Sequence, residues 1–593
     1  MLRYSYVHTA TEATTGYFSC EPSPPLSLEE ALHYLASHPL DDFMRRHVLA
    51  RMGSLSGRQV AECIAGFFPG PPPEAVTALL GELCLLNPAL RDDMPLAAER
   101  DKETASTDAT SLIFLRWREL PDHELHRQWI RIFTSNIREH RALKTPEEIG
   151  LPPPYPDGFD GDVQKTGSSI PSFTTGIADI YPLHPASRLA DAPPHHRPSS
   201  VETAALAEER LTRLGIIAGQ EMRHTASLSP VGLLRPWNVR LSVRRGRHDF
   251  SLEGQATTYG RGLSVPDARA SCLMEMVERA SAYLSLTEDG VTVLTKDGVT
   301  GLAEPLPVIT ATRSTLLAEY GAALDPNDFC LEVPYNDARL TWISGRQAHR
   351  SNGSAVRTSP IWVPVQMVSL FSNLDEIALS DAPGSTGIAT GCSMEEAQVA
   401  ALLEILERDA EATTPFSKSS CFTLEADAAI DPLIAALLAD YKARGINVQF
   451  QDLTGPLGVP VYKCFVMSTK GAIAAGHGAG LSARKAIVSA LTETPFPYPD
   501  GEPSGPLLRK LPARKLHEMP DYSLASPAAN LSLLEDLLLS NGRAPIYVTL
   551  TRQDLGFPVV RALAPGMEPA ADGSDFRRVP RRLYANYLGS LQK

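Results

Sequence analysis

The sequence predicts an α+β fold built from repeated units of strand, Gly-rich turn and helix, preceded by a small all-helical domain. One motif carries most of this prediction. It consists of Gly-x-Ser, an Ala four residues after the Ser, and Glu eleven and fourteen residues after it, and it occurs at 262–278 and 391–407. A third stretch at 480–493 keeps the register as far as its first Glu, after which Pro495 ends the helix. Alternating, β-branched stretches around the copies are typical of strands.

We expect residues 1–150 to form the helical N-terminal domain. The first 25 residues look loose, and Ser27 with Glu30 is a capping-box signature for the first helix. Apolar residues recur at helical spacing in further windows at about 41–52, 56–67, 73–87 and 109–142. These residues suggest no chemistry, so we interpret the domain as a structural or partner-docking module.

The chain changes character after this domain. Residues 151–199 are rich in Pro, Gly and Ser, which is typical of a linker or a long surface excursion. Residues 200–593 are then expected to form one α+β domain with internal repetition. A helix at 201–216 and strands at 237–243 and 249–260 should lead into the first repeat.

Composition excludes several classes of function. The chain has 43% hydrophobic residues and a formal net charge of −14, which argues against a nucleic-acid-binding surface. We find no run of about 18 apolar residues that would span a membrane, and the N-terminus lacks the apolar segment of a signal peptide. The eight cysteines form no Cys-x-x-Cys pair, which excludes the common zinc spacings. A cytoplasmic location is the simplest expectation.

The Gly-x-Ser turns predict the helix starts and a binding role. Ser264, Ser393 and Ser482 stand where a hydroxyl can accept a hydrogen bond from a free N–H of the first helical turn. Such a turn also has a positive dipole end and unpaired N–H groups. It is therefore a natural seat for phosphate.

The repeated glutamates predict a charged site. Three residues correspond to about 300° of helix rotation, so Glu275 and Glu278 share one face, as do Glu404 and Glu407. They could be the solvent face of amphipathic helices. The fixed register favours instead a centre where these residues and Glu493 converge. Carboxylates crowded at low dielectric need cations, and Mg²⁺ with nucleotide phosphates suits hard oxygen ligands.

These motifs resemble a known family. The stretches GRGLSVPDARASCLMEMVERAS, STGIATGCSMEEAQVAALLEILERDA and TRQDLGFPVVRALAPGME are similar to the three signature regions of the YcaO family, over about residues 200–593. The resemblance implies an ATP- and Mg²⁺-dependent enzyme that phosphorylates a backbone amide oxygen of a peptide or protein. A nucleophile then attacks the activated carbon. A Cys, Ser or Thr side chain gives an azoline, sulfide a thioamide and an amine an amidine.

The resemblance also implies site residues, although it names no catalytic residue. Arg408 would counter phosphate charge, with Arg279 as the analogous residue of the first repeat, unless both form only local ion pairs. The metal ligands implied are Glu275, Glu278, Glu404, Glu407 and Glu493. The implied nucleotide-binding residues are Thr203, Arg261, Ser271, Glu275, Glu278, Glu396, Glu404, Glu407 and Arg408.

The chain departs from the family pattern at several positions. Arg261 replaces a Lys, Cys392 stands where Asn is usual, and the Gln and Arg that usually follow the Glu of the third region are missing after Glu493. Candidates to replace that Arg are Arg261, Arg279, Arg561 and the tail arginines Arg577, Arg578, Arg581 and Arg582. The chain also ends without the Pro-x-Pro-x-Pro tail of azoline-forming members, which favours thioamidation.

Two functions remain open from the sequence. The leading hypothesis is a thioamide-forming enzyme of peptide post-translational modification, with a TfuA-type or peptide-docking partner. The alternative is a degenerate member that binds a peptide or partner enzyme without catalysis. A homodimer is left open.

The domain division predicts a proteolysis pattern. Residues 1–150 have a core of their own and a Pro-rich segment after them, so this part should fold independently. Limited proteolysis followed by mass spectrometry should give first cuts between about 150 and 200. Cleavage throughout 25–145 with the linker protected would contradict the division.

Overall fold

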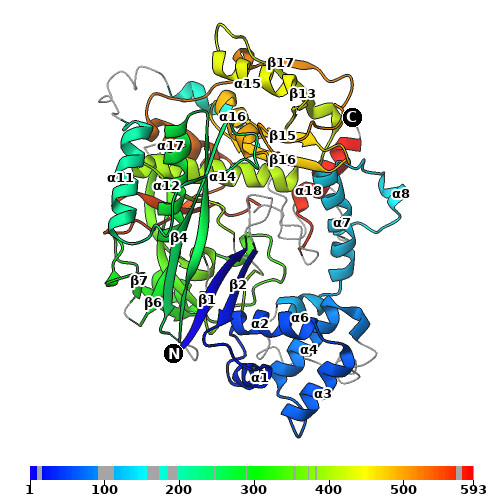
Figure 1. The fold of residues 1–593 in the computed structure, drawn as a ribbon, viewed down its shortest axis with the longest axis vertical. Coiled ribbons are helices and arrows are strands. Elements are labelled where there is room, and N and C mark those ends of the chain that lie inside the picture. Colours follow the sequence, from blue (N-terminus) through cyan, green and yellow to red (C-terminus); the bar gives the residue numbers. More distant parts are fainter. Residues whose placement is uncertain are drawn as a thin grey trace.

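Three β-sheets and their covering helices make up the computed structural model (Figure 1). The structure describes residues 1–9, 17–90, 113–155, 173–184, 197–245, 249–288, 290–350, 356–370, 373–380, 384–568 and 577–591. Within these ranges the predicted α+β class is confirmed. No helix of the described part is both long enough and apolar enough to cross a membrane.

The first sheet joins the N-terminus to the middle of the chain. Its order is β2 (Tyr17–Pro22), β1 (Leu2–Thr9), β5 (Phe250–Gly262), β4 (Val231–Val243), β6 (Ser285–Thr287), β7 (Gly290–Thr295) and β8 (Gly298–Thr300), with β3 (Met222–Arg223) beside β4. Strand β1 runs parallel to β5, with Leu2 opposite Phe250. The expectation that the first 25 residues are loose is therefore wrong for the described residues. Every second side chain of β1 faces the core, as buried Tyr4 and Tyr6 show.

The N-terminal helices follow the predicted windows. They are α1 (Leu28–Ser37), α2 (Asp42–Gly53), α3 (Gly57–Phe67), α4 (Glu74–Leu86), η1 (Pro88–Leu90), α6 (Ile113–Arg118), α7 (His123–Glu139) and α8 (Pro146–Ile149). The capping box of Ser27 and Glu30 is present. Helix α7 lies beside the C-terminal α18 (Arg581–Leu591), where Trp129 packs on Tyr584 and Tyr587 (Figure 1).

The contacts of β1 and α7 cross the predicted boundary at residue 150. The division into 1–150, 151–199 and 200–593 stays a prediction. Much of the predicted linker lies outside the described residues.

The other two sheets carry the later repeats. The second has the order β11 (Val356–Pro364), β10 (Leu340–Arg350), β18 (Ile546–Thr549), β19 (Val559–Leu563) and β12 (Ile388–Thr390), with β9 (Val308–Ala311) beside β10. The third has the order β16 (Ile473–Ala479), β15 (Val461–Met467), β14 (Gln449–Asp452), β13 (Cys421–Glu425) and β17 (Ala513–Lys515). The further helices are α9 (Ile177–Ile180), α11 (Ser200–Arg213), α13 (Arg313–Tyr320), α15 (Pro432–Ala443) and α17 (Pro527–Ser540), and the short 3₁₀ helices are η2 (Tyr181–Leu183), η3 (Pro326–Asp328), η4 (Val365–Met367), η5 (Lys418–Ser420) and η6 (Leu516–Glu518).

Each repeat helix packs on the strand that precedes it. Helix α12 (Val265–Ala282) lies on β5, α14 (Met394–Thr413) on β12, and α16 (Ala483–Glu493) on β16. A Cβ atom on Gly260 would lie 2.0 Å from the Ala268 carbonyl oxygen, and one on Gly478 would lie 2.2 Å from that of Ala486. The glycines therefore permit a close approach of strand and helix.

The predicted helix starts are confirmed, since α12, α14 and α16 each begin directly after the predicted Ser, but only two of the three capping bonds form. Ser264 accepts from the Asp267 N–H and Ser393 from the Glu396 N–H, so both cap their helices as expected. The third predicted capping bond is wrong, because Ser482 stands at the N-cap of α16 but its side chain makes no such bond. It bonds Asp521 instead.

The contact of β1 with the core predicts a stability effect. Tyr4 is 2% exposed, packs edge-on against Phe43 and Phe250, and donates to Asp41 Oδ2 at 2.8 Å. Tyr4→Ala should lower the free energy of unfolding in urea by about 3 to 5 kcal/mol, because a large buried side chain is lost. Tyr4→Phe is the matched control and should cost about 1 kcal/mol, for the hydrogen bond alone. Equal, small effects would show that β1 contributes little to the core.

Candidate functional site

The two glutamates of α12 are held by an arginine and a strand. Glu275 Oε2 accepts from the Tyr259 N–H of β5 at 3.1 Å. The Arg279 guanidinium lies 3.6 Å from Glu275 Oε1 and 3.4 Å from Glu278 Oε1. Burial raises the pKa of Glu278 to about 8, with Arg279 acting against it and Glu404 adding to it.

The glutamates of α14 are held in the same way. Glu404 Oε2 accepts from the Gly387 N–H at 3.1 Å, and Glu407 Oε2 accepts from the Ala479 N–H of β16 at 2.8 Å. Arg408 lies 3.3 Å from Glu407 Oε1. Burial raises the pKa of Glu407 to about 8, opposed by Arg408 and reinforced by Glu493 and Glu404.

The three repeats close into a ring. Helix α12 also touches β12, α14 touches β16, and α16 touches β5, so each repeat contacts the strand of the next. Glu404 raises the pKa of both Glu278 and Glu407, and Glu493 raises that of Glu407. Arg261 on β5 lies 3.9 Å from Glu493 and connects the third repeat to the first. The structure thus brings the predicted carboxylates into one continuous cluster.

Two of the other predicted nucleotide contacts, Thr203 and Glu396, lie at the N-terminal end of α14. Thr203 Oγ1 is 3.7 Å from the Cys392 sulfur, and the Cys392 N–H donates to Glu396 Oε2 at 3.0 Å. Arg197 Nε lies 3.1 Å from the other Glu396 oxygen. Ser271 is exposed on α12, one turn before Glu275. Thr203 and Glu396 therefore share one end of the site, whereas Ser271 faces solvent.

Arg561 is a further cation of the cluster, which the sequence offered only among several candidates. It lies on β19, is 6% exposed, and donates through Nη1 to the Gly384 carbonyl at 3.0 Å. Burial lowers its pKa to about 10, Glu404 and Glu278 act against that shift, and Arg279 adds to it. Its Nε is buried and has no hydrogen-bond partner among the described atoms.

The tail arginines have other partners. Arg582 donates to Asp409 at 2.6 Å, Arg578 donates to Asp122 at 2.9 Å, and Arg577 lies 3.9 Å from Glu568. Among the candidates for the missing arginine, the described contacts therefore favour Arg261, Arg279 and Arg561, which lie beside the glutamates of the cluster.

The donor chemistry of the cluster fits magnesium. Carboxylate oxygens are the ligands that Mg²⁺ prefers. Burial raises the pKa values of Glu278, Glu404 and Glu407 despite the neighbouring arginines, so a bound cation would stabilise their charged forms. In the described part of the chain no three His, Cys, Asp or Glu side chains are already grouped as metal ligands. The carboxylates instead contact Arg279, Arg408 and backbone N–H groups, so a cation has to take over some of these contacts.

Comparison with known proteins defines the class. Residues 259–495 match the family model described as a YcaO cyclodehydratase that binds ATP and Mg²⁺. They therefore form a domain of the YcaO family, whose members are ATP-dependent peptide-modifying enzymes. The predicted family, ATP and Mg²⁺ are confirmed at this level, while the roles of individual residues stay predictions.

Individual relatives are distant. The chain is 24% identical over 419 residues to an uncharacterized protein of Methanothermobacter thermautotrophicus, covering 65% of this chain and 97% of that protein. It is 21% identical over 316 residues to an uncharacterized protein in the tfuA 3′ region of Rhizobium leguminosarum bv. trifolii, covering 52% of this chain and 62% of that one.

Solved structures are similarly remote. The chain is similar to YcaO from Methanopyrus kandleri bound with AMPPCP and Mg²⁺, with 19% identity, a TM-score of 0.42 and coverage of 62% of this chain and 91% of that one. It is also similar to a heterocyclase in complex with substrate and cofactor, with 16% identity, a TM-score of 0.47 and coverage of 65% and 56%.

The raised carboxyl pKa values predict pH-dependent magnesium affinity. At pH 7 a group with a pKa of about 8 is mostly protonated, and cation binding must release that proton. The affinity for Mg²⁺ in the presence of a non-hydrolysable ATP analogue should therefore rise as pH increases towards about 8 and level off above it. Calorimetric titration at several pH values measures this, and Glu407→Gln should flatten the curve. An affinity independent of pH would contradict the assignment.

Proposed function

We propose that this protein is an ATP- and Mg²⁺-dependent enzyme that modifies backbone amides of a peptide or protein, and that its product is a thioamide. The observation that carries the proposal is the partly buried cluster of glutamates from three repeat helices, with Arg279, Arg408 and Arg561 fixed beside it. Buried charge of both signs around one centre suits a polyphosphate with its cation.

The reaction transfers the γ-phosphoryl group of ATP to the amide oxygen and releases ADP. Sulfide then attacks the activated carbon, and the carbon–oxygen bond breaks. The amide oxygen leaves with the phosphate, which takes up the proton of hydrosulfide, so atoms and charges balance. When bound, Mg²⁺ neutralises negative charge on the phosphates.

In this reaction the arginines of the protein stabilise the negative charge of the phosphoryl group that is transferred. Arg561 projects from a strand and is held by the Gly384 carbonyl, so its position is set before substrate binds. Arg279 and Arg408 are each held by carboxylates of their own helix. Fixed cations stabilise charge that develops in the transition state without reorganising, and loss of one such donor typically costs about 10² to 10³ in rate.

Thioamide formation and its partner rest on a separate observation. One relative is described as lying in the tfuA 3′ region. This supports a TfuA-type protein as the partner of this chain and a peptide as its substrate.

A second candidate function is a scaffold that binds ATP or peptide without catalysis. Two observations favour it. Helix α16 ends at Glu493 without the Gln and Arg that the family pattern places there, and Cys392 replaces the usual Asn. Either change removes a side chain that the family pattern places at the site.

Phosphate release decides between the two functions. With Mg²⁺, ATP, sulfide, a candidate precursor peptide and a TfuA-type protein, we expect peptide-stimulated phosphate release and a peptide mass that matches exchange of one oxygen for sulfur. Arg561→Met should lower this rate about 100-fold, and Glu404→Ala should weaken Mg²⁺·ATP binding at least about 10-fold. Glu62→Gln, an exposed change on α3, is the matched control and should change neither.

Each possible result of this experiment points to a different conclusion about the function or the site. Binding of Mg²⁺·ATP with no peptide-stimulated release under any partner condition supports the scaffold. Tight binding that is unchanged in Glu404→Ala shows that the site has been misplaced. Release with cyclised rather than sulfur-containing peptide would retain the enzyme and reject thioamide formation.

A further inference from the structure

Glu411 lies one helical turn beyond Glu407 on α14. Arg408 donates through Nη1 to Glu411 Oε2 at 3.0 Å, while its Nη2 lies 3.3 Å from Glu407. The guanidinium is thus held at two corners by carboxylates on the same helix. An arginine with five N–H donors can make both contacts and keep others for a phosphate.

The second oxygen of Glu411 faces two basic side chains of the third sheet. Glu411 Oε1 lies 3.7 Å from His477 Nδ1 on β16, and Lys463 on β15 is the residue paired with His477. Burial alone would raise the pKa of Glu411, but His477, Arg408 and Lys463 lower it below its ordinary value. Because burial lowers the pKa of His477 to about 4, Arg408 and Lys463 supply the positive charge at neutral pH. Glu411 therefore remains a carboxylate despite its burial.

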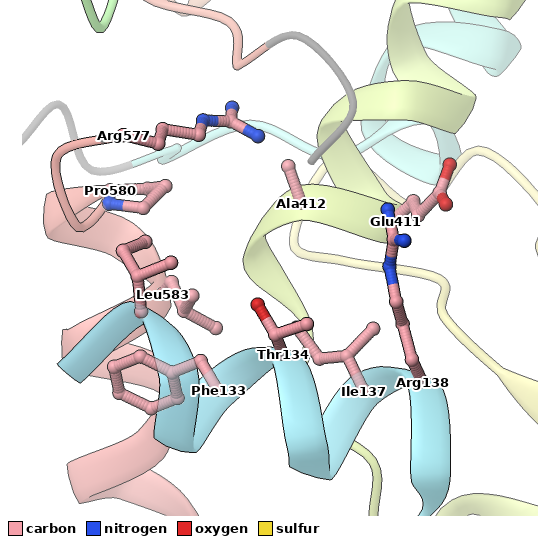
Figure 2. Close-up of a pocket in the computed structure, with 10 residues that line it drawn as sticks. Phe133, Thr134, Ile137, Arg138, Glu411, Ala412, Arg577, Pro580 and Leu583 are labelled. Atoms are coloured by element: carbon pink, nitrogen blue, oxygen red, sulfur yellow. The ribbon is translucent and has the colours of Figure 1, made fainter. Parts of the chain in front are cut away.

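Helix α7 supplies the outer wall of this group. Figure 2 shows the Arg138 side chain extending from α7 towards Glu411, beside a cavity of about 30 Å³ between α7, α14 and α18. Lys463 Nζ donates to the Ile137 carbonyl of the same helix at 2.6 Å. Arg138 acts electrostatically on both Lys463 and His477, which places its charge close to them.

The end of α7 is itself firmly seated. Asn136 accepts from the Phe416 N–H at 2.8 Å and donates to the Phe416 carbonyl at 3.2 Å. The His140 ring stacks on the Phe416 ring with centroids 3.7 Å apart. Arg138 lies between these two anchors, so packing fixes the backbone from which its exposed side chain extends.

We propose that Glu411 is a positioning residue that fixes Arg408 for the phosphates, and that Arg138 of α7 braces Glu411 from the other side. Neither residue binds the nucleotide. The proposal rests on the proposed function, because it needs Arg408 to act on ATP. It makes α7, which lies outside the matched segment 259–495, part of the active-site support.

A double-mutant cycle tests this role in the full-length protein. The four proteins are the wild type, Glu411→Gln, Arg408→Lys and the double variant, and the measurements are kcat and KM for ATP in peptide-stimulated phosphate release together with Mg²⁺·ATP affinity. Glu411→Gln should lower kcat about 10-fold, the usual effect of losing an outer positioning contact. The double variant should be no slower than Arg408→Lys, because Glu411 acts only through Arg408.

A second variant, on a different helix, provides a test that does not depend on whether Glu411→Gln folds correctly. Arg138→Gln should lower kcat in the same direction by less, whereas Arg58→Gln on the exposed face of α3 should have no effect. The inference is overturned if the double variant has a kcat lowered by the product of the two single-variant factors, or if Glu411→Gln keeps the wild-type kcat. Either result leaves the proposed function standing. A wild type that neither binds nor hydrolyses Mg²⁺·ATP overturns the proposed function and this inference with it.

Discussion

The close approach of each repeat helix to its strand is the constraint on which the site depends. At Gly260 and Gly478 a side chain would collide with the helix backbone, so only glycine allows the helix to lie there. This approach brings Glu275 within hydrogen-bond distance of the Tyr259 N–H on its own strand. Glu404 accepts from the Gly387 N–H just before β12, and Glu407 from the Ala479 N–H on the strand of the next repeat. The glycines of the turns that suggested a phosphate-binding site therefore also allow the helix backbone to pack closely against the strand. The ring of three repeats then turns three separate faces into one cluster.

Clustered carboxylates cost stability, and the structure shows how that cost is limited. Each repeat helix with two glutamates also carries an arginine, and β19 adds Arg561. These cations do not fully offset burial, since the pKa values of Glu278 and Glu407 remain near 8. A site that is short of positive charge has a direct use for a metal ion. Burying the glutamates lowers the folding stability of the protein, and the same buried carboxylates raise its affinity for a cation.

The features of the fold and site that the sequence predicted correctly are those that depend on local sequence pattern. The register of Gly, Ser and Glu placed α12, α14 and α16 and grouped their glutamates, because helix geometry ties spacing to a shared face. The strand at the N-terminus was missed because its partner β5 lies about 250 residues away. Arg561 could be named but not chosen, and Glu411 was passed over, since their positions depend on contacts between distant elements. The Ser482 cap failed for the same reason, because Asp521 competes for the hydroxyl.

Helices from both ends of the chain, α7 and α18, lie against the last turn of α14. Its last turn is held from one side by Arg582 on Asp409, and by Asn586, which donates to the Thr413 carbonyl at 2.7 Å. From the other side α7 approaches through Arg138, while Trp129 ties α7 to α18. Glu404 and Glu407, the carboxylates proposed to bind the metal, lie just before this clamped turn, so α14 cannot rotate without breaking both sets of contacts. The N- and C-terminal helices thus act together as one support for Arg408, although the sequence assigns them to different parts of the chain.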